Sequence, residues 1–190
     1  MRMDGWRVGS VVSEDGRVFV GDADRSLAPI EREDLLRLAE LATEVEKGLF
    51  LRRPQGAGRY SGRLLGRALC QGAALHYLNG SNGVKDFDVW SLYAAIDGHP
   101  FPYRWLICRD FGPSKFGRHP EDPPHYEGRR VDFLGRSLPV PPGTDPAVAL
   151  RRYLTSRRTG TAKALATKAV VLISPQNRVG EIVWPTPPAD

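Results

Sequence analysis

The chain has 190 residues, 41% of them hydrophobic, and a formal net charge of +5. Its length fits one domain, or one domain with a small appendage, and its composition is that of a globular protein with an apolar core. No apolar run reaches the roughly 18 residues of a membrane-spanning helix, and the first residues contain no apolar signal-peptide core. We therefore expect a cytoplasmic protein without a membrane partner. The modest positive charge favours anionic partners such as nucleotides, RNA or an acidic protein.

Two β-rich runs near the N-terminus, residues 6–12 and 17–20, flank Asp15 and Gly16. Asp-Gly between two such runs is typical of a tight hairpin turn. The chain then divides into three expected parts. These are an N-terminal hairpin appendage with a linker (1–28), one main domain (29–184) and a short tail (185–190).

The first long helix is expected over residues 29–47. Pro29 suits the first turn of a helix, and Gly48 is a residue type at which helices often end. Acidic side chains in the first turn complement the positive end of the helix dipole. Apolar residues recur at helical spacing and predict a packing face, formed by Leu35, Leu38, Ala39, Ala42 and Val45.

Residues 66–90 hold the most informative pattern. A short apolar run leads to Gly72 and a small helix, and a later strand carries Asp86 and Asp88. Alternate residues of a strand point to the same face, so the two carboxylates project side by side while Phe87 points to the other face. Carboxylates this close repel each other unless a cation lies between them. Because Mg²⁺ or Mn²⁺ binds carboxylate and phosphate oxygens, we interpret the pair as a candidate metal platform for phosphate chemistry.

A third acid, Asp132, stands in a later apolar stretch between Val131 and Phe133. A carboxylate inside a buried strand needs a partner or a metal ion, because an unpaired buried charge is costly. An ion pair with Arg130 or Arg136 is one solution, and a metal ion is the other.

The strand-to-helix turn at Gly72, followed by Asp-x-Asp on the next strand, resembles the nucleotidyltransferase fold of the polymerase-beta-like superfamily, most closely its small toxin- and antitoxin-associated members. The resemblance implies an α+β fold with a small mixed β-sheet flanked by helices. It also implies that Gln71, Gly72 and Ala73 bind the nucleotide. Gln71 stands where the family has glycine, and Ala73 where it often has serine or threonine. Three acids are implied as metal ligands and catalytic residues, namely Asp86, Asp88 and Asp132.

The implied function is metal-dependent transfer of a nucleoside monophosphate from an NTP to a hydroxyl acceptor on RNA, a protein or a small molecule. Asp132 would accept the proton of the acceptor hydroxyl or help to bind a second metal ion. Two alternatives stay open. One is a degenerate member of the fold that binds a nucleotide or a partner without catalysis, as an antitoxin might. The other is a metal-dependent nuclease that uses the same acids to activate water.

Several further features give expectations that a structure can check. Residues 91–96 should form a short helix, and Lys85 should alternate away from the carboxylates on an ideal strand. Cys70 and Cys108 should be buried free thiols. The segment 109–128 is either a long connection or a loop that stacks a base and neutralises phosphate. Its basic and aromatic residues are Phe111, Lys115, Phe116, Arg118, His119, His125 and Tyr126.

Overall fold

The computed structural model describes residues 11–12, 18–19, 24–102 and 107–185. Near the N-terminus, β1 (Val11–Val12) pairs antiparallel with β2 (Val18–Phe19), as expected for a hairpin around the Asp-Gly turn. The other residues of that expected hairpin, and the last five residues of the tail, lie outside the described residues.

The longest helix is α1 (Arg32–Arg52). The backbone N–H of Glu31 donates to Asp34 Oδ2 at 2.8 Å, which satisfies a group at the start of the helix. The expected apolar face is buried. The helix nevertheless begins later than Pro29 and runs past Gly48, because Leu49 is still needed in the apolar core. Its buried residues are Leu35, Leu38, Leu41, Ala42, Val45 and Leu49.

Six strands form one mixed sheet in the order β5-β6-β4-β3-β7-β8. The strands are β3 (Leu64–Cys70), β4 (Phe87–Ala94), β5 (Ile107–Asp110), β6 (Arg130–Leu138), β7 (Ala169–Ser174) and β8 (Ile182–Trp184). Strands β4 and β6 run parallel, and the other neighbouring pairs are antiparallel. The expectation of a mixed α and β protein with a mixed sheet and flanking helices is therefore confirmed.

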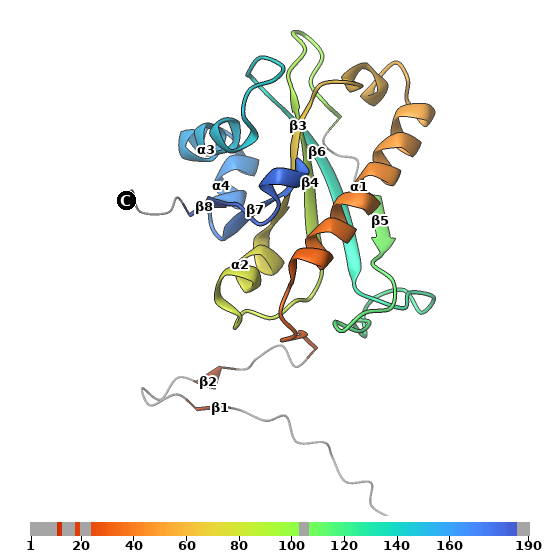
Figure 1. The fold of residues 1–190 in the computed structure, drawn as a ribbon, viewed down its shortest axis with the longest axis vertical. Coiled ribbons are helices and arrows are strands. Elements are labelled where there is room, and N and C mark those ends of the chain that lie inside the picture. Colours follow the sequence, from red (N-terminus) through yellow and green to blue (C-terminus); the bar gives the residue numbers. More distant parts are fainter. Residues whose placement is uncertain (1–10, 13–17, 20–23, 103–106, 186–190) are drawn as a thin grey trace, which may run out of the picture.

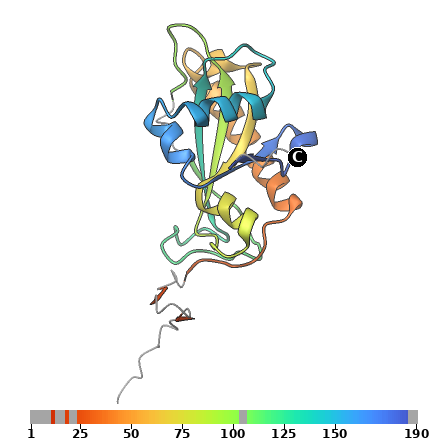
Figure 2. The same cartoon turned by 90° about the vertical axis from the view of Figure 1, so that its left-hand side faces the viewer.

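Helices cover both faces of this sheet (Figures 1 and 2). On one face, α1 and α2 (Gln71–Asn79) share an apolar cluster with the inward side chains of the central strands. On the other, α3 (Pro146–Ser156) and α4 (Gly160–Leu165) pack over a second cluster that contains Trp90 and Leu92. Alternation along β4 divides its side chains between the two clusters.

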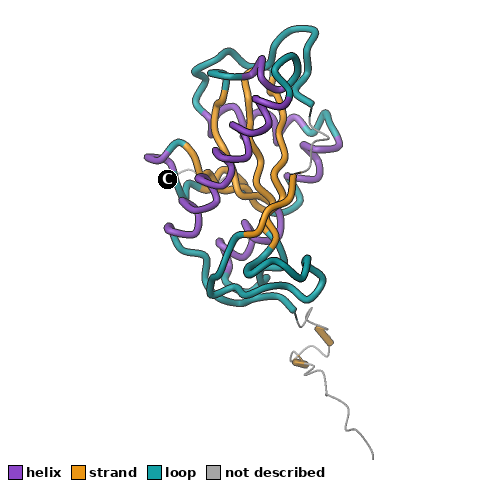
Figure 3. The backbone as a smooth tube through the Cα atoms, turned by 90° about the vertical axis from the view of Figure 1, so that its right-hand side faces the viewer, coloured by secondary structure: helices purple, strands orange, loops and turns teal. Residues whose placement is uncertain are grey.

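The expectation of a short helix at residues 91–96 is wrong, because β4 continues to Ala94. Strand neighbours on both sides pair with this stretch, and this tertiary pairing overrides the local sequence signal. At one end of the sheet, the long connection between β5 and β6 lies with the turn that follows α2, among the loops drawn in teal at the lower end of Figure 3. Within the described ranges, no helix combines the length and apolar character needed to cross a membrane.

Candidate functional site

Two of the predicted acids lie side by side on neighbouring central strands. Asp88 of β4 is in register with Asp132 of β6, its parallel neighbour. Asp86 stands two residues before Asp88, and both line one pocket. Phe87 is fully buried in the opposite cluster, as the alternation predicts. The structure thus brings the three acids together at one end of the sheet, on the face covered by α3 and α4.

The two cysteines continue the same row of residues across the sheet. Cys70 is opposite Asp88, and Cys108 is opposite Asp132. Both thiols are free, but only Cys70 is fully buried, so the expectation of two buried thiols holds in full for that residue alone. Burial, with the nearby charge of Asp88, raises the pKa of Cys70. Burial and a hydrogen bond to Asp132 raise the pKa of Cys108 to about 11. Both thiols are therefore protonated at neutral pH, which makes them poor nucleophiles and poor metal ligands.

The crowding of these acids changes the pKa of Asp88. Burial, followed by the charges of Asp86 and Asp132, raises its pKa to about 7. Lys168 and Arg130 act in the opposite direction but do not cancel the effect. A carboxyl group with such a pKa has a net unfavourable environment for its charged form, and an added cation would relieve it.

Arg130 holds the other two acids. Its Nη2 lies 3.1 Å from Asp86 Oδ2, and its Nε lies 3.1 Å from Asp132 Oδ1. Although burial lowers the pKa of Arg130, the charges of Asp132 and Asp86 raise it overall. The ion-pair reading of Asp132 is therefore confirmed with Arg130, whereas Arg136 donates to Thr161 Oγ1 at 2.9 Å.

This arginine also affects how a metal ion could bind. Among the residues that the structure describes, no three His, Cys, Asp or Glu side chains are arranged to hold a metal ion together. Asp132 is 8% exposed and does not line the pocket, while Asp86 and Asp88 do. Of the three predicted acids, Asp86 and Asp88 are thus presented to the pocket, and Asp86 and Asp132 are both paired with Arg130.

The turn from β3 into α2 has an unusual backbone. Gln71, the first residue of α2, has a φ of +60°, a value that glycine adopts much more easily than glutamine. Its side-chain amide donates to the carbonyl of Ala164 at 3.3 Å. Strained φ values of this kind occur preferentially at functional sites. Gln71 and Gly72 line the pocket, whereas the Ala73 side chain is buried in the core.

Two cations lie close to this helix start. An ideal Cβ placed on Gly72 would lie 3.6 Å from Arg25 Nη1 and 4.0 Å from Lys168 Nζ. The first N–H groups of a helix have no partner within the helix, and they carry partial positive charge. The start of α2 and these two side chains therefore make one side of the pocket favourable for an anion.

We call the resulting cavity the acid pocket. It has a volume of about 490 Å³ and is open to solvent, and cavities of this size commonly bind small ligands. It is lined by Arg25, Gln71, Gly72, Lys85, Asp86, Asp88, His119, Glu121, Asp122, Arg130 and Lys168. Arg25, Glu121, Asp122 and Lys168 were missed by sequence reasoning, because they come from three separate stretches that only the folded chain brings together.

Lys85 corrects an expectation. It lines the acid pocket, and its Nζ lies 2.9 Å from Glu121 Oε2. The chain bends at Lys85, and the regular strand begins only at Phe87, so ideal alternation does not apply to this residue.

The connection between β5 and β6 also differs from one expectation. Phe111 and Phe116 are buried and contact Phe87, with ring centroids 5.0 Å and 5.3 Å away. They belong to the core and are not available to stack a base. Lys115 is held by Glu31 and Asp34 at 2.6 Å and 3.0 Å. The part of this loop that reaches the acid pocket is His119, Glu121 and Asp122.

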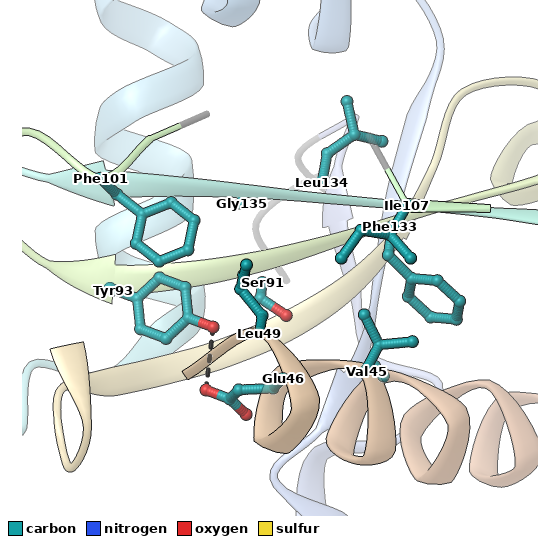
Figure 4. A pocket seen from close by; sticks show the side chains of 11 residues that line it. Val45, Glu46, Leu49, Ser91, Tyr93, Phe101, Ile107, Phe133, Leu134 and Gly135 are labelled. Carbon is teal, nitrogen blue, oxygen red and sulfur yellow. Dashed lines mark hydrogen bonds between the residues drawn. The ribbon is translucent and has the colours of Figure 1, made fainter. Parts of the chain in front are cut away.

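A second pocket lies on the α1 face of the sheet (Figure 4). Its volume is about 20 Å³, which is room for about one water molecule. Tyr93 donates from its hydroxyl to Glu46 Oε1 at 2.8 Å, and Glu46 also pairs with the buried Arg67. This network satisfies buried charge inside the core and offers no room for an organic ligand.

Comparison of the chain with protein-family models, curated proteins and solved structures found no match.

Proposed function

We propose that the protein binds a nucleoside triphosphate in the acid pocket and transfers its nucleoside monophosphate to a hydroxyl acceptor. The observation that carries the proposal is the placement of Asp86 and Asp88 beside the start of α2 in one pocket. Acids that favour a cation and a helix start that favours an anion share one cavity. A metal-bound triphosphate has both of these charges.

The donor set suits a hard divalent cation. Mg²⁺ commonly binds one or two protein carboxylates and completes its ligands with water and substrate phosphates. Asp86 and Asp88 are the two carboxylates that would hold it, so the lack of a preformed three-residue group does not exclude this type of site. When bound with the substrate, such a cation neutralises the charge that develops on the reacting phosphate.

The residues at the start of α2 and the cations beside it would orient the polyphosphate. The N–H groups at the start of α2, together with Arg25 and Lys168, are placed to receive its oxygens. The acceptor oxygen then forms a bond to the α-phosphorus. The bond from this phosphorus to the bridging oxygen breaks, and pyrophosphate leaves with the electron pair. The acceptor proton would pass to Asp132, which is buried beside the pocket, so Arg130 must first release that carboxylate and open a path to it.

A second candidate function is nucleotide binding without transfer. The ion pairs of Arg130 favour it, because its guanidinium already neutralises Asp86 and Asp132. If Arg130 stays in place when a nucleotide binds, Asp132 is not available to accept the proton. The protein would then act as a binding or regulatory subunit.

The proposal is tested by calorimetric titration of each of the four NTPs, with Mg²⁺, into the wild type and Asp88→Asn. We expect Mg²⁺-dependent binding by the wild type and a loss of at least about tenfold in affinity in the variant, since a charged metal ligand is removed. Asp97→Asn is the matched control, because Asp97 is an exposed acid in the turn beyond the far end of β4. No binding of any NTP, or equal binding by wild type and Asp88→Asn, would refute the proposed site.

Transfer is separated from binding by a second assay. Wild-type protein with Mg²⁺, a bound NTP and a panel of RNA, protein and small-molecule acceptors should release pyrophosphate. Nucleotide binding without pyrophosphate release for any acceptor would favour the second candidate.

A further inference from the structure

His119 is a buried polar side chain in the acid pocket. It lies in the connection between β5 and β6 and is 2% exposed. Its Nδ1 accepts a hydrogen bond from the backbone N–H of Glu121 at 3.1 Å. The neutral ring therefore carries its proton on Nε2. No group in the described part of the chain accepts a hydrogen bond from that Nε2.

The surrounding loop holds the ring in place. The backbone carbonyl of His119 accepts from the N–H of Asp122 at 3.0 Å and from Arg118 Nη1 at 3.4 Å. Arg118 also donates to the carbonyl of Asp122 at 2.8 Å. A buried donor without an acceptor is unfavourable, so this position requires an oxygen atom of water or of a ligand beside Nε2.

The charges around the pocket indicate which oxygen this is. The cations near Gly72, namely Arg25 and Lys168, lie at the start of α2. His119 instead lies in the same loop as Glu121 and Asp122. Glu121 is paired with Lys85, and Asp122 accepts from the backbone N–H of Arg130, so this loop offers no excess positive charge to attract a polyphosphate. An uncharged oxygen is the better acceptor on that side of the pocket.

We infer that His119 Nε2–H donates to an uncharged oxygen of the nucleoside, a ribose hydroxyl or a base carbonyl, while the polyphosphate lies toward α2. This assignment rests on the proposed function and deepens it by giving the nucleotide a direction in the pocket. His119 is then a binding residue that recognises the nucleoside and has no role in proton transfer.

Two variants separate the two ring nitrogens. His119→Asn keeps an acceptor oxygen near the place of Nδ1 and removes the Nε2 donor. His119→Gln keeps an N–H near the place of Nε2 and removes the Nδ1 acceptor. Each is titrated with the tightest-binding Mg²⁺-NTP and with Mg²⁺-tripolyphosphate, which has the phosphates but no nucleoside.

We expect His119→Asn to weaken NTP binding about tenfold, the loss of one buried hydrogen bond, and to change tripolyphosphate binding less than about twofold. His119→Gln should bind both ligands within about threefold of the wild type. Unchanged NTP affinity in His119→Asn overturns the inference. Equal losses for both ligands also overturn it, because His119 then acts on the phosphates or on the loop.

A measurement on the wild type keeps the test valid if His119→Asn does not fold. The Nε2–H proton signal of His119 should shift in NMR spectra when Mg²⁺-NTP binds and stay in place with Mg²⁺-tripolyphosphate. The same shift with both ligands contradicts the inference. Wild type that binds no NTP overturns the proposed function and this inference together. NTP binding that is lost in Asp88→Asn but normal in His119→Asn overturns the inference alone.

Discussion

Asp88 makes the stability of this protein depend on pH in the direction opposite to that of most carboxylates. Burial and the nearby Asp86 and Asp132 raise its pKa from 3.8 to about 7. Between these two values the folded protein holds a proton that the unfolded chain has lost, so stability falls as pH rises through this window. The difference corresponds to at most about 4 kcal/mol, and water entering the open pocket reduces it.

Asp88→Asn removes the charge and keeps the size of the side chain. We expect the variant and the wild type to have similar stability at pH 4.5. As pH rises toward 8, the variant becomes more stable than the wild type by about 2–4 kcal/mol. The groups that face Asp88 are the same in both proteins, so their own titration largely cancels in the difference. They are Asp86, Asp132, Arg130, Lys168 and Cys70.

The assay is urea denaturation at half-unit pH steps from 4.5 to 8, with a chelator present so that no divalent cation binds. The quantity compared at each pH is the free energy of unfolding of the variant minus that of the wild type. Asp97→Asn serves as the control, and its difference should stay flat. A flat difference for Asp88→Asn as well would refute the reasoning, because the carboxylate would then not be crowded in the folded state.

Three more substitutions test other parts of the structure. The free energy of unfolding of Gln71→Gly should be about 1 kcal/mol higher than that of Gln71→Ala. Both variants lose the amide hydrogen bond, but only glycine removes the strain of the positive φ. Equal midpoints in urea would contradict this. Glu46→Gln should lower the free energy of unfolding by about 3–5 kcal/mol, since it leaves a buried guanidinium unpaired, while Tyr93→Phe should cost only about 1 kcal/mol. Similar losses in thermal or urea unfolding would argue against that ranking. Arg130→Gln should raise the affinity for Mg²⁺ alone about fivefold in calorimetry, because it frees Asp86 and Asp132 from their ion pairs. Arg136→Gln is the control and should leave this affinity unchanged. Unchanged Mg²⁺ binding by Arg130→Gln would show that the arginine does not compete with a cation.

The helical and strand periodicities predicted much of the architecture. The leucines of α1 and the alternation around Phe87 gave the buried faces of both elements. Boundaries were less predictable, as the extension of α1 beyond Gly48 and of β4 through residues 91–94 shows. An element's end depends on whether neighbouring strands and helices still bury the next side chain, and the local sequence does not contain that information.

Some features of the candidate site could also be predicted from the sequence, and others could not. The spacing of Asp86 and Asp88 predicted that two carboxylates lie together, and both line the acid pocket, although Asp86 precedes the regular strand, which begins at Phe87. The sequence offered two arginines, Arg130 and Arg136, as ion-pair partners of Asp132, and the structure shows that Arg130 is the partner. The contribution of Lys168, distant in sequence, could not be read from any local pattern.

The sequence by itself determined the residue types of this site and the closeness of Asp86 and Asp88, because residues two apart in the chain cannot be far apart in space. The tertiary structure decided the charge balance around that pair. It brought a guanidinium between two of the acids, cations to the start of α2, and the buried ring of His119 into the same pocket. Burial and electrostatic interactions depend on distances in space, and the sheet order β5-β6-β4-β3-β7 sets those distances between segments that are far apart along the chain.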